Sequence, residues 1–141
     1  MTIKITGTDI IDQSRNILTS TFSNYTEFAY NLGSISGSTP SITISNGNVQ
    51  YGTLPNNAVT FSFNTTGMPS SGAFSFVLYL TNPGVTASTI NWPASVKWQG
   101  NTTPPAGTGG WTTTANKTNV WSFITLDAGT SWYGILSQIN V

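Results

Sequence analysis

The chain has 141 residues, a length that fits one compact domain with or without an extended arm. Only 6% of the residues are charged, the net charge is zero, and no basic cluster is present, so nucleic-acid binding and attachment to anionic lipid are excluded. Cys and His are absent, which excludes disulfides, cysteine nucleophiles, Ser-His-Asp triads and the usual zinc ligand sets. The chain also shows no secretory signal and no run of about 18 apolar residues, so membrane insertion is not expected.

Uncharged side chains supply most of the polarity. Thr, Ser and Asn together make up 55 of the 141 residues. Thr favours strands, whereas Asn and Ser favour turns. A surface with so little charge promotes association between molecules. We therefore expect a β-rich protein that works within an assembly.

Residues 1–33 are predicted to form an extended arm that docks on or intertwines with other chains. The apolar residues of this segment are too few and too interrupted to build a core of their own. Residues 25–32 fit either a short helix or a strand, and their β-like flanks favour the strand. Residues 34–39 are predicted to form a linker. The expected docking or subunit interface within the arm consists of Ile10, Ile11, Arg15, Ile17, Leu18 and Phe22.

Residues 40–141 are predicted to form the head. Residues 42–45 alternate between apolar and polar types and end at Asn46-Gly47, which favours a tight hairpin turn before a strand that starts near Val49. Residues 59–63 show the same alternation. Residues 74–80 are the most apolar run, and they predict a central strand that is covered on both faces for part of its length.

The second half of the head continues the pattern. Short strands are expected at residues 89–92 and 96–98, followed by a long loop over residues 100–114. A strand over residues 120–126, a hairpin turn over 127–130 and a last strand over 132–141 complete the chain. Turns every 8–12 residues without helical crossovers predict an all-β fold: an antiparallel β-sandwich, jelly-roll-like, carrying the extended N-terminal arm.

Several stretches resemble a module of phage tail-fibre and related virion proteins, many of them from marine and cyanobacterial phages. The similar stretches are Ile-Asn-Trp-Pro-Ala-Ser-Val-Lys-Trp at residues 90–98, Val-Trp-Ser-Phe at 120–123 after Lys117, and Asp-Ala-Gly-Thr-Ser-Trp-Tyr-Gly at 127–134. The segment at residues 8–17 resembles an Ile-Asp-x-x-Arg-Asn-Ile motif of fibre proteins. Together these matches cover roughly residues 8–22 and 59–141.

This resemblance implies a trimeric, β-structured component of the virion exterior that has no catalytic activity. Two features depart from the family pattern. The loop over residues 100–114 is longer than the module has, and the chain lacks a repetitive shaft. A capsid-decorating (cement) protein or a small adaptor fibre therefore stays open as an alternative.

The acidic residues are too few and too scattered for a typical hydrolase, which needs two positioned carboxylates. They are Asp9, Asp12, Glu27 and Asp127. Asp9 and Asp12 lie three residues apart on an extended segment, so their side chains point to opposite sides. Asp127 opens a turn, where a carboxylate accepts backbone N–H groups. We expect no enzymatic activity, no metal site and no cofactor.

Four of the five tryptophans are predicted to pack in a core or a subunit interface. Trp92, Trp98, Trp121 and Trp132 lie in or beside predicted strands and fit a core or a subunit interface. Trp111 lies in a Gly-rich loop, where it could contact a ligand or a neighbouring subunit, or fold back over its own core.

Two readings of the function follow. The first is a non-enzymatic structural protein of a phage virion, a small tail-fibre component that forms a homotrimer and contacts other virion proteins. The second is a lectin-like head for host attachment, which binds host-surface glycan and gains avidity from the trimer.

Overall fold

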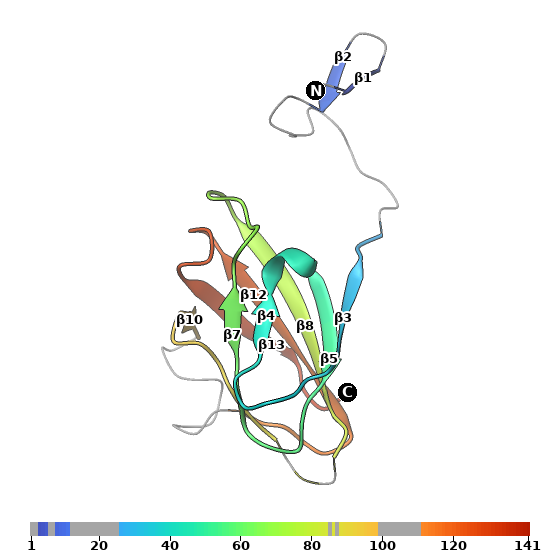
Figure 1. The fold of residues 1–141 in the computed structure, drawn as a ribbon, viewed down its shortest axis with the longest axis vertical. Coiled ribbons are helices and arrows are strands. Elements are labelled where there is room, and N and C mark those ends of the chain that lie inside the picture. The colour runs from blue at the N-terminus through green and yellow to red at the C-terminus, as the bar shows by residue number, and fades with distance from the viewer. Residues whose placement is uncertain (1–2, 6–7, 12–25, 85, 87, 99–110) are drawn as a thin grey trace.

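The computed structural model describes residues 26–84, 86, 88–98 and 111–141 in full, and residues 3–5 and 8–11 by their backbone alone (Figure 1). Within these residues the only helix is a single 3-10 turn, η1 (Ile44–Asn46), and all other regular structure is strand. The predicted all-β fold class is thereby confirmed. No helix of the described part is long and apolar enough to span a membrane. The strands are β1 (Ile3–Ile5), β2 (Thr8–Ile11), β3 (Ala29–Ser34), β4 (Ser41–Thr43), β5 (Val49–Thr53), β6 (Val59–Thr60), β7 (Ser62–Asn64), β8 (Phe74–Asn82), β9 (Thr89–Asn91), β10 (Val96–Lys97), β11 (Trp111–Thr112), β12 (Lys117–Thr125) and β13 (Trp132–Gln138).

A six-stranded sheet in the order β10-β13-β12-β8-β5-β3 is the largest element of the head. β8 is an inner strand of this sheet, as its apolar run predicts. Its neighbour β12 pairs with it antiparallel over nine residues, from Lys117 opposite Asn82 to Thr125 opposite Phe74. Three smaller sheets consist of β11-β9-β6, β4-β7 and β1-β2.

The predicted antiparallel arrangement is only partly correct, because the six-stranded and three-stranded sheets are mixed and the sheet β4-β7 is parallel. β3, β5 and β8 run parallel to one another, and so do the pairs β10–β13, β4–β7 and β6–β9. Parallel neighbours cannot be joined by a tight hairpin. The chain therefore crosses from one sheet to another between strands that the sequence pattern places in a simple meander.

The predicted hairpin at Asn46-Gly47 is wrong for this reason. After β4 the chain turns through η1, and the side chain of Ile44 is buried in the core. β5 then joins the six-stranded sheet, while β4 stays paired with β7. The buried Gln50 side chain holds this crossing in place: its amide Nε2 donates to the backbone oxygens of Thr43 and Gly47 at 3.0 and 3.1 Å.

The six-stranded sheet also includes residues that the sequence assigns to the arm and the linker. β3 confirms the predicted strand for residues 29–32, whereas residues 26–28 have no regular structure and residue 25 lies outside the described chain. β3 pairs parallel to β5 at the edge of the sheet. The backbone N–H of Ile35 donates to the carbonyl oxygen of Thr53 at 2.8 Å. Leu32 and Ile35 are partly buried against the core. The sheet of the head therefore begins at residue 29, before the predicted start at residue 40.

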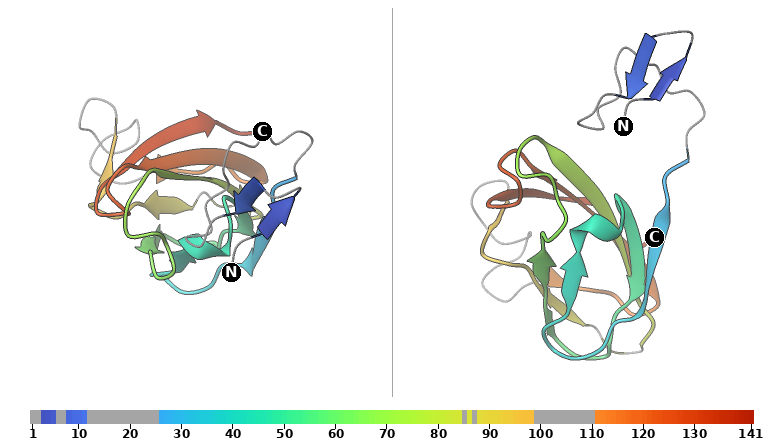
Figure 2. Two further views of the ribbon diagram at one scale, coloured as in Figure 1. Left: turned by 90° about the horizontal axis from the view of Figure 1, so that it is seen from above. Right: turned by 45° about the horizontal axis from the view of Figure 1, so that its top comes forward.

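The core is aromatic and lies between the inner face of the six-stranded sheet and two of the smaller sheets, β4-β7 and β11-β9-β6. Figures 1 and 2 show β4 and β7 on one side of the large sheet. From β7 the ring of Phe63 contacts Phe76, Phe123 and Trp132 edge-on, with centroid distances of 5.3, 5.1 and 5.4 Å. Such edge-to-face geometry adds to the free energy gained by burying the rings. Phe76, Leu78 and Leu80 on the inner side of β8 are buried. On its outer side Tyr79 is exposed and Val77 is half-buried, so the outer side is covered only in part by the described chain.

Candidate functional site

The outward side of the six-stranded sheet is the most unusual surface of the described chain. We call it the outer face and define it by the outward-pointing residues of β5, β8, β12 and β13. None of these residues is charged. They are Val49, Tyr51, Thr53, Ser75, Val77, Tyr79, Thr81, Thr118, Val120, Ser122, Ile124, Tyr133, Ile135 and Ser137.

Large apolar and aromatic side chains of the outer face are open to solvent. Tyr51 lies opposite Tyr79 across β5 and β8, and Ile124 lies opposite Tyr133 across β12 and β13. All four are exposed, and Ile135 is 61% exposed. Monomeric proteins rarely leave such a contiguous apolar patch uncovered. The outer face therefore has the character of an interaction surface.

The hydroxyl groups of the outer face are paired with one another in at least two places. The Oγ1 atoms of Thr81 and Thr118 are 2.8 Å apart, and the Oγ atoms of Ser122 and Ser137 are 2.7 Å apart. A polar group that already has a hydrogen-bond partner can be removed from water at a lower free-energy cost than an unpaired one. The free-energy cost of removing these parts of the face from water is therefore lower than it would be for unpaired hydroxyl groups.

A depression of about 280 Å³ lies on the same face. Its walls come from β8, β12 and β13, and outward side chains of the outer face line it. Those side chains are Ser75, Val77, Ser122, Ile124, Tyr133 and Ile135. The depression holds no charged group, so it is suited to an apolar or aromatic side chain.

Trp111 lies in β11, opposite Ile90 of β9, and is half-buried. Its ring meets Trp121 edge-on, with a centroid distance of 5.7 Å and an interplanar angle of 83°. Trp121 is itself in contact with Trp92 and Trp98, so four tryptophans form one cluster at the edge of the core. This geometry agrees with a residue folded over its own core, one of the alternatives that the sequence leaves open.

The predicted interface in the arm is only partly described. Ile10 and Ile11 lie in β2, which pairs with β1 as an antiparallel hairpin. Arg15, Ile17, Leu18 and Phe22 lie outside the described residues. The outer face was not predicted, although the sequence carries a signal for it: in β8, β12 and β13 the outward positions carry Tyr, Val, Ile, Ser or Thr and no charge.

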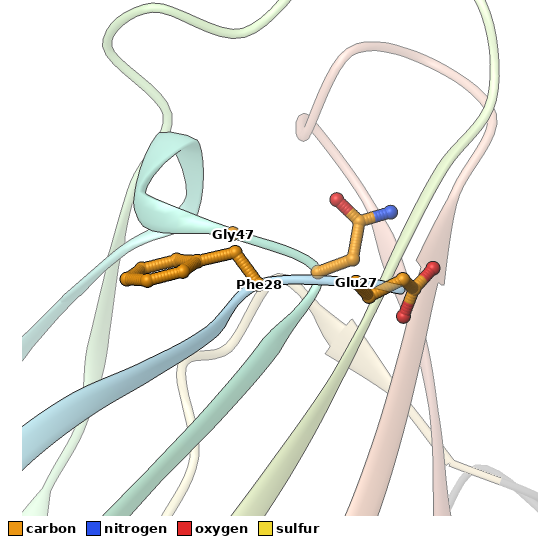
Figure 3. A pocket seen from close by; sticks show the side chains of 4 residues that line it. Glu27, Phe28 and Gly47 are labelled. Atoms are coloured by element: carbon orange, nitrogen blue, oxygen red, sulfur yellow. The ribbon is translucent and has the colours of Figure 1, made fainter. Parts of the chain in front are cut away.

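A second depression, of about 340 Å³, lies where β3 and β5 begin, and is lined by Glu27, Phe28, Gly47 and Asn48. Figure 3 shows the Phe28 ring lying beside Gly47 and the Glu27 carboxylate directed the other way. Acid–base catalysis by paired carboxylates requires two acids, and only one lines this depression. In the described part of the chain, no group of three or more Asp and Glu residues could hold a metal ion.

Asp127 has the turn role that the sequence predicts. Its Oδ1 accepts hydrogen bonds from the Ser131 backbone N–H at 2.9 Å and from the Thr125 hydroxyl at 2.8 Å. These bonds, the Ser131 N–H foremost, lower the pKa of the Asp127 carboxyl below its ordinary value of 3.8. Ala128 and Gly129, the next two residues, both have positive φ, which is typical of a type I′ turn. The carboxylate therefore organises the β12–β13 connection.

Replacing Asp127 with asparagine should lower the melting temperature slightly near pH 7. Because folding lowers the pKa of Asp127, the charged carboxylate stabilises the fold above its ordinary pKa, and this contribution is lost as the pH falls through the lowered pKa. Thermal melts of wild type and Asp127→Asn at about pH 7 and about pH 2 test this, with a gap that narrows at the lower pH. A gap of equal size at both pH values would show that the charge is not its source.

Comparison of the chain with protein-family models, with curated proteins and with solved structures finds no match.

Proposed function

We propose that this chain is a non-enzymatic structural protein of a phage virion, a small homotrimeric tail-fibre component on the exterior of the particle. In this proposal the head is a jelly-roll-like β-sandwich, and the N-terminal residues form an arm that docks on other virion proteins. The observation that carries the proposal is the outer face, a sheet surface across four strands with exposed Tyr and Ile side chains and no charge. Such a surface needs a protein partner to be covered.

The composition supports the same function. A particle component that is permanently assembled has no need of the surface charge that keeps free proteins apart in solution. Charged side chains make up only 6% of the chain, against roughly 25% in an average soluble protein. Of the acidic side chains that the structure describes, Asp127 organises a turn and Glu27 borders a depression with no second carboxylate. The side chains of Asp9 and Asp12 lie outside the described part.

Native mass measurement of the purified chain is the first test, and the expected species is a trimer of the 15.0 kDa chain. Antibodies against the chain should then label the tail of the phage particle that encodes it. Labelling of the capsid would replace the tail-fibre assignment with capsid decoration. A monomer that labels no particle would contradict the proposal. Binding to host-surface glycan on a glycan array would favour the lectin-like head.

A further inference from the structure

We infer that a β-bulge in β3 prevents other chains from adding a strand to the open edge of the six-stranded sheet. β3 is the last strand of that sheet, so one of its edges has no partner among the described residues. Such an edge presents backbone N–H and C=O groups with which a strand of another molecule can pair. The inference does not depend on the proposed function, because it concerns a contact that the protein avoids.

The usual means of protecting an edge strand are absent from β3. Proteins commonly protect such a strand with charged side chains, above all Lys, or with proline. β3 has the sequence Ala-Tyr-Asn-Leu-Gly-Ser, which contains neither. The opposite edge of the sheet differs, since β10 has only two residues and one of them is Lys97. Protection of the edge at β3 therefore depends on its backbone geometry.

The pairing of β3 with β5 contains one extra residue. Asn31 lies opposite Tyr51 and Gly33 lies opposite Gly52, so Leu32 has no partner of its own in β5. Two residues of β3 thus face Gly52 alone, which is the pattern of a β-bulge. Gly33 has a φ of 68°, the left-handed conformation that glycine adopts readily in bulges. A bulge bends the strand, and it interrupts the straight edge that an added strand would need.

Contacts on both sides hold the bulge in place. On the exposed side, the Oδ1 atom of Asn31 accepts a hydrogen bond from the backbone N–H of Gly33 at 2.8 Å. This N–H group is therefore already paired and is not offered to a strand from outside. On the inner side, a Cβ atom at Gly52 would lie 2.9 Å from the Cβ of Leu32 and 3.2 Å from the carbonyl oxygen of Gly33. The bulge accordingly depends on asparagine at position 31 and on glycine at positions 33 and 52.

The regular part of the edge that remains is short. Before the bulge, only the three residues 29–31 pair with β5 in unbroken register. At a rise of about 3.3 Å per residue this segment is about 10 Å long, whereas strands in globular proteins typically have about 5–6 residues. A strand added there would gain few backbone hydrogen bonds. Association of the protein is therefore left to side-chain surfaces such as the outer face.

Deletion of Gly33 is the first test, because it removes the extra residue and keeps the strand in phase. Tyr30, Leu32 and Ile35, which are partly buried, then alternate with a period of two along one side of the strand. The variant should keep the circular dichroism spectrum of the wild type but form species of at least twice its mass as the concentration rises, measured by light scattering. The matched control is deletion of Gly72, which also has positive φ, lies between β7 and β8, and has no atom within 4 Å of its Cβ position. The control should keep the wild-type mass.

A second variant leaves the chain length unchanged. Asn31→Ala removes the acceptor of the Gly33 N–H group, so it should cause the same association to a smaller extent. Asn57→Ala is its matched control, because Asn57 is an exposed asparagine outside β3, and it should have no effect.

Hydrogen exchange and a compensating charge identify the surface in contact. In the associated species, the backbone N–H groups of β3 should exchange more slowly than in the wild type, because they are paired with another chain. Combining Asn31→Lys with the Gly33 deletion should restore the wild-type mass, since a charged side chain on an edge strand opposes pairing.

Three results would overturn the inference. A folded protein that lacks Gly33 and keeps the wild-type mass at high concentration shows that the bulge does not protect the edge. If the deletion prevents folding, a wild-type mass for Asn31→Ala leads to the same conclusion. Associated species in which the N–H groups of β3 exchange as fast as in the wild type are held together through another surface.

Discussion

Replacing Trp121 with alanine is expected to lower the free energy of unfolding by about 3–5 kcal/mol, the range found when buried aromatic side chains are truncated. Trp121 has no exposed surface and lies on the inner side of β12. Its ring contacts Trp92, Trp98 and Trp111. Removing it leaves a cavity bordered by three other indoles, which are too large and too constrained to fill it.

Urea denaturation followed by tryptophan fluorescence and by circular dichroism measures this loss. Phe28→Ala is the matched control, because it truncates an aromatic ring that is exposed, and it should change the stability by less than about 0.5 kcal/mol. If the two substitutions have similar effects, the tryptophan cluster does not have the central packing role assigned to it.

Two N-terminal truncations should differ sharply in stability. A chain that begins at residue 26 keeps β3, and its head should melt as the full chain does. A chain that begins at residue 39 loses β3, its backbone hydrogen bonds to β5, and the contacts of Leu32 and Ile35. Both side chains pack directly over the backbone of Gly52. Burial of each such side chain is worth roughly 1.5–3 kcal/mol when complete, so the shorter chain should be destabilised by several kcal/mol.

Thermal melts of the two truncated chains, followed by circular dichroism, measure this difference in stability. The result locates the boundary of the head, which the sequence pattern puts at residue 40 and the sheet puts at residue 29. Equal melting of both truncated chains would mean that β3 adds nothing to the stability of the head.

Local sequence pattern was sufficient to find the strands with the strongest alternation. Phe76, Leu78 and Leu80 recur with a period of two in β8, and Trp121, Phe123 and Thr125 do so in β12. In each case one side of the strand is buried. The turn after β12 was also predictable, because an Asp at its first position has a defined chemical role there.

The pairing of the strands was not predictable from the same pattern. Asn46-Gly47 suits a tight hairpin turn, but the gain from burying Ile44 in the core directs the chain into another sheet. Which strand becomes the neighbour of β5 depends on β8, more than twenty residues later, and no local signal reports such a partner. The same argument applies to the parallel pairs β4–β7 and β6–β9.

The candidate site was predictable only in part. Low charge indicated association, but it did not show which surface associates. The outward residues of β13, such as Tyr133 and Ile135, are recognisable as one surface with Tyr79 only when the strand order is known. The surroundings of Trp111 could not be predicted either. Its Gly-rich neighbourhood is compatible with exposure, but the ring packs on Trp121.

The order of the strands has a consequence for how the protein reaches its native state during synthesis. Phe76 in β8 pairs with Phe123 in β12, forty-seven residues later in the chain. The nascent β8 can recruit β5, but its other edge stays unpaired until β12 has left the ribosome. Long-range pairing of this kind makes folding slow and leaves unpaired strand edges accessible to other chains. The head can therefore complete its fold only after β12 and β13 have been synthesised, and at high rates of synthesis aggregation competes with folding.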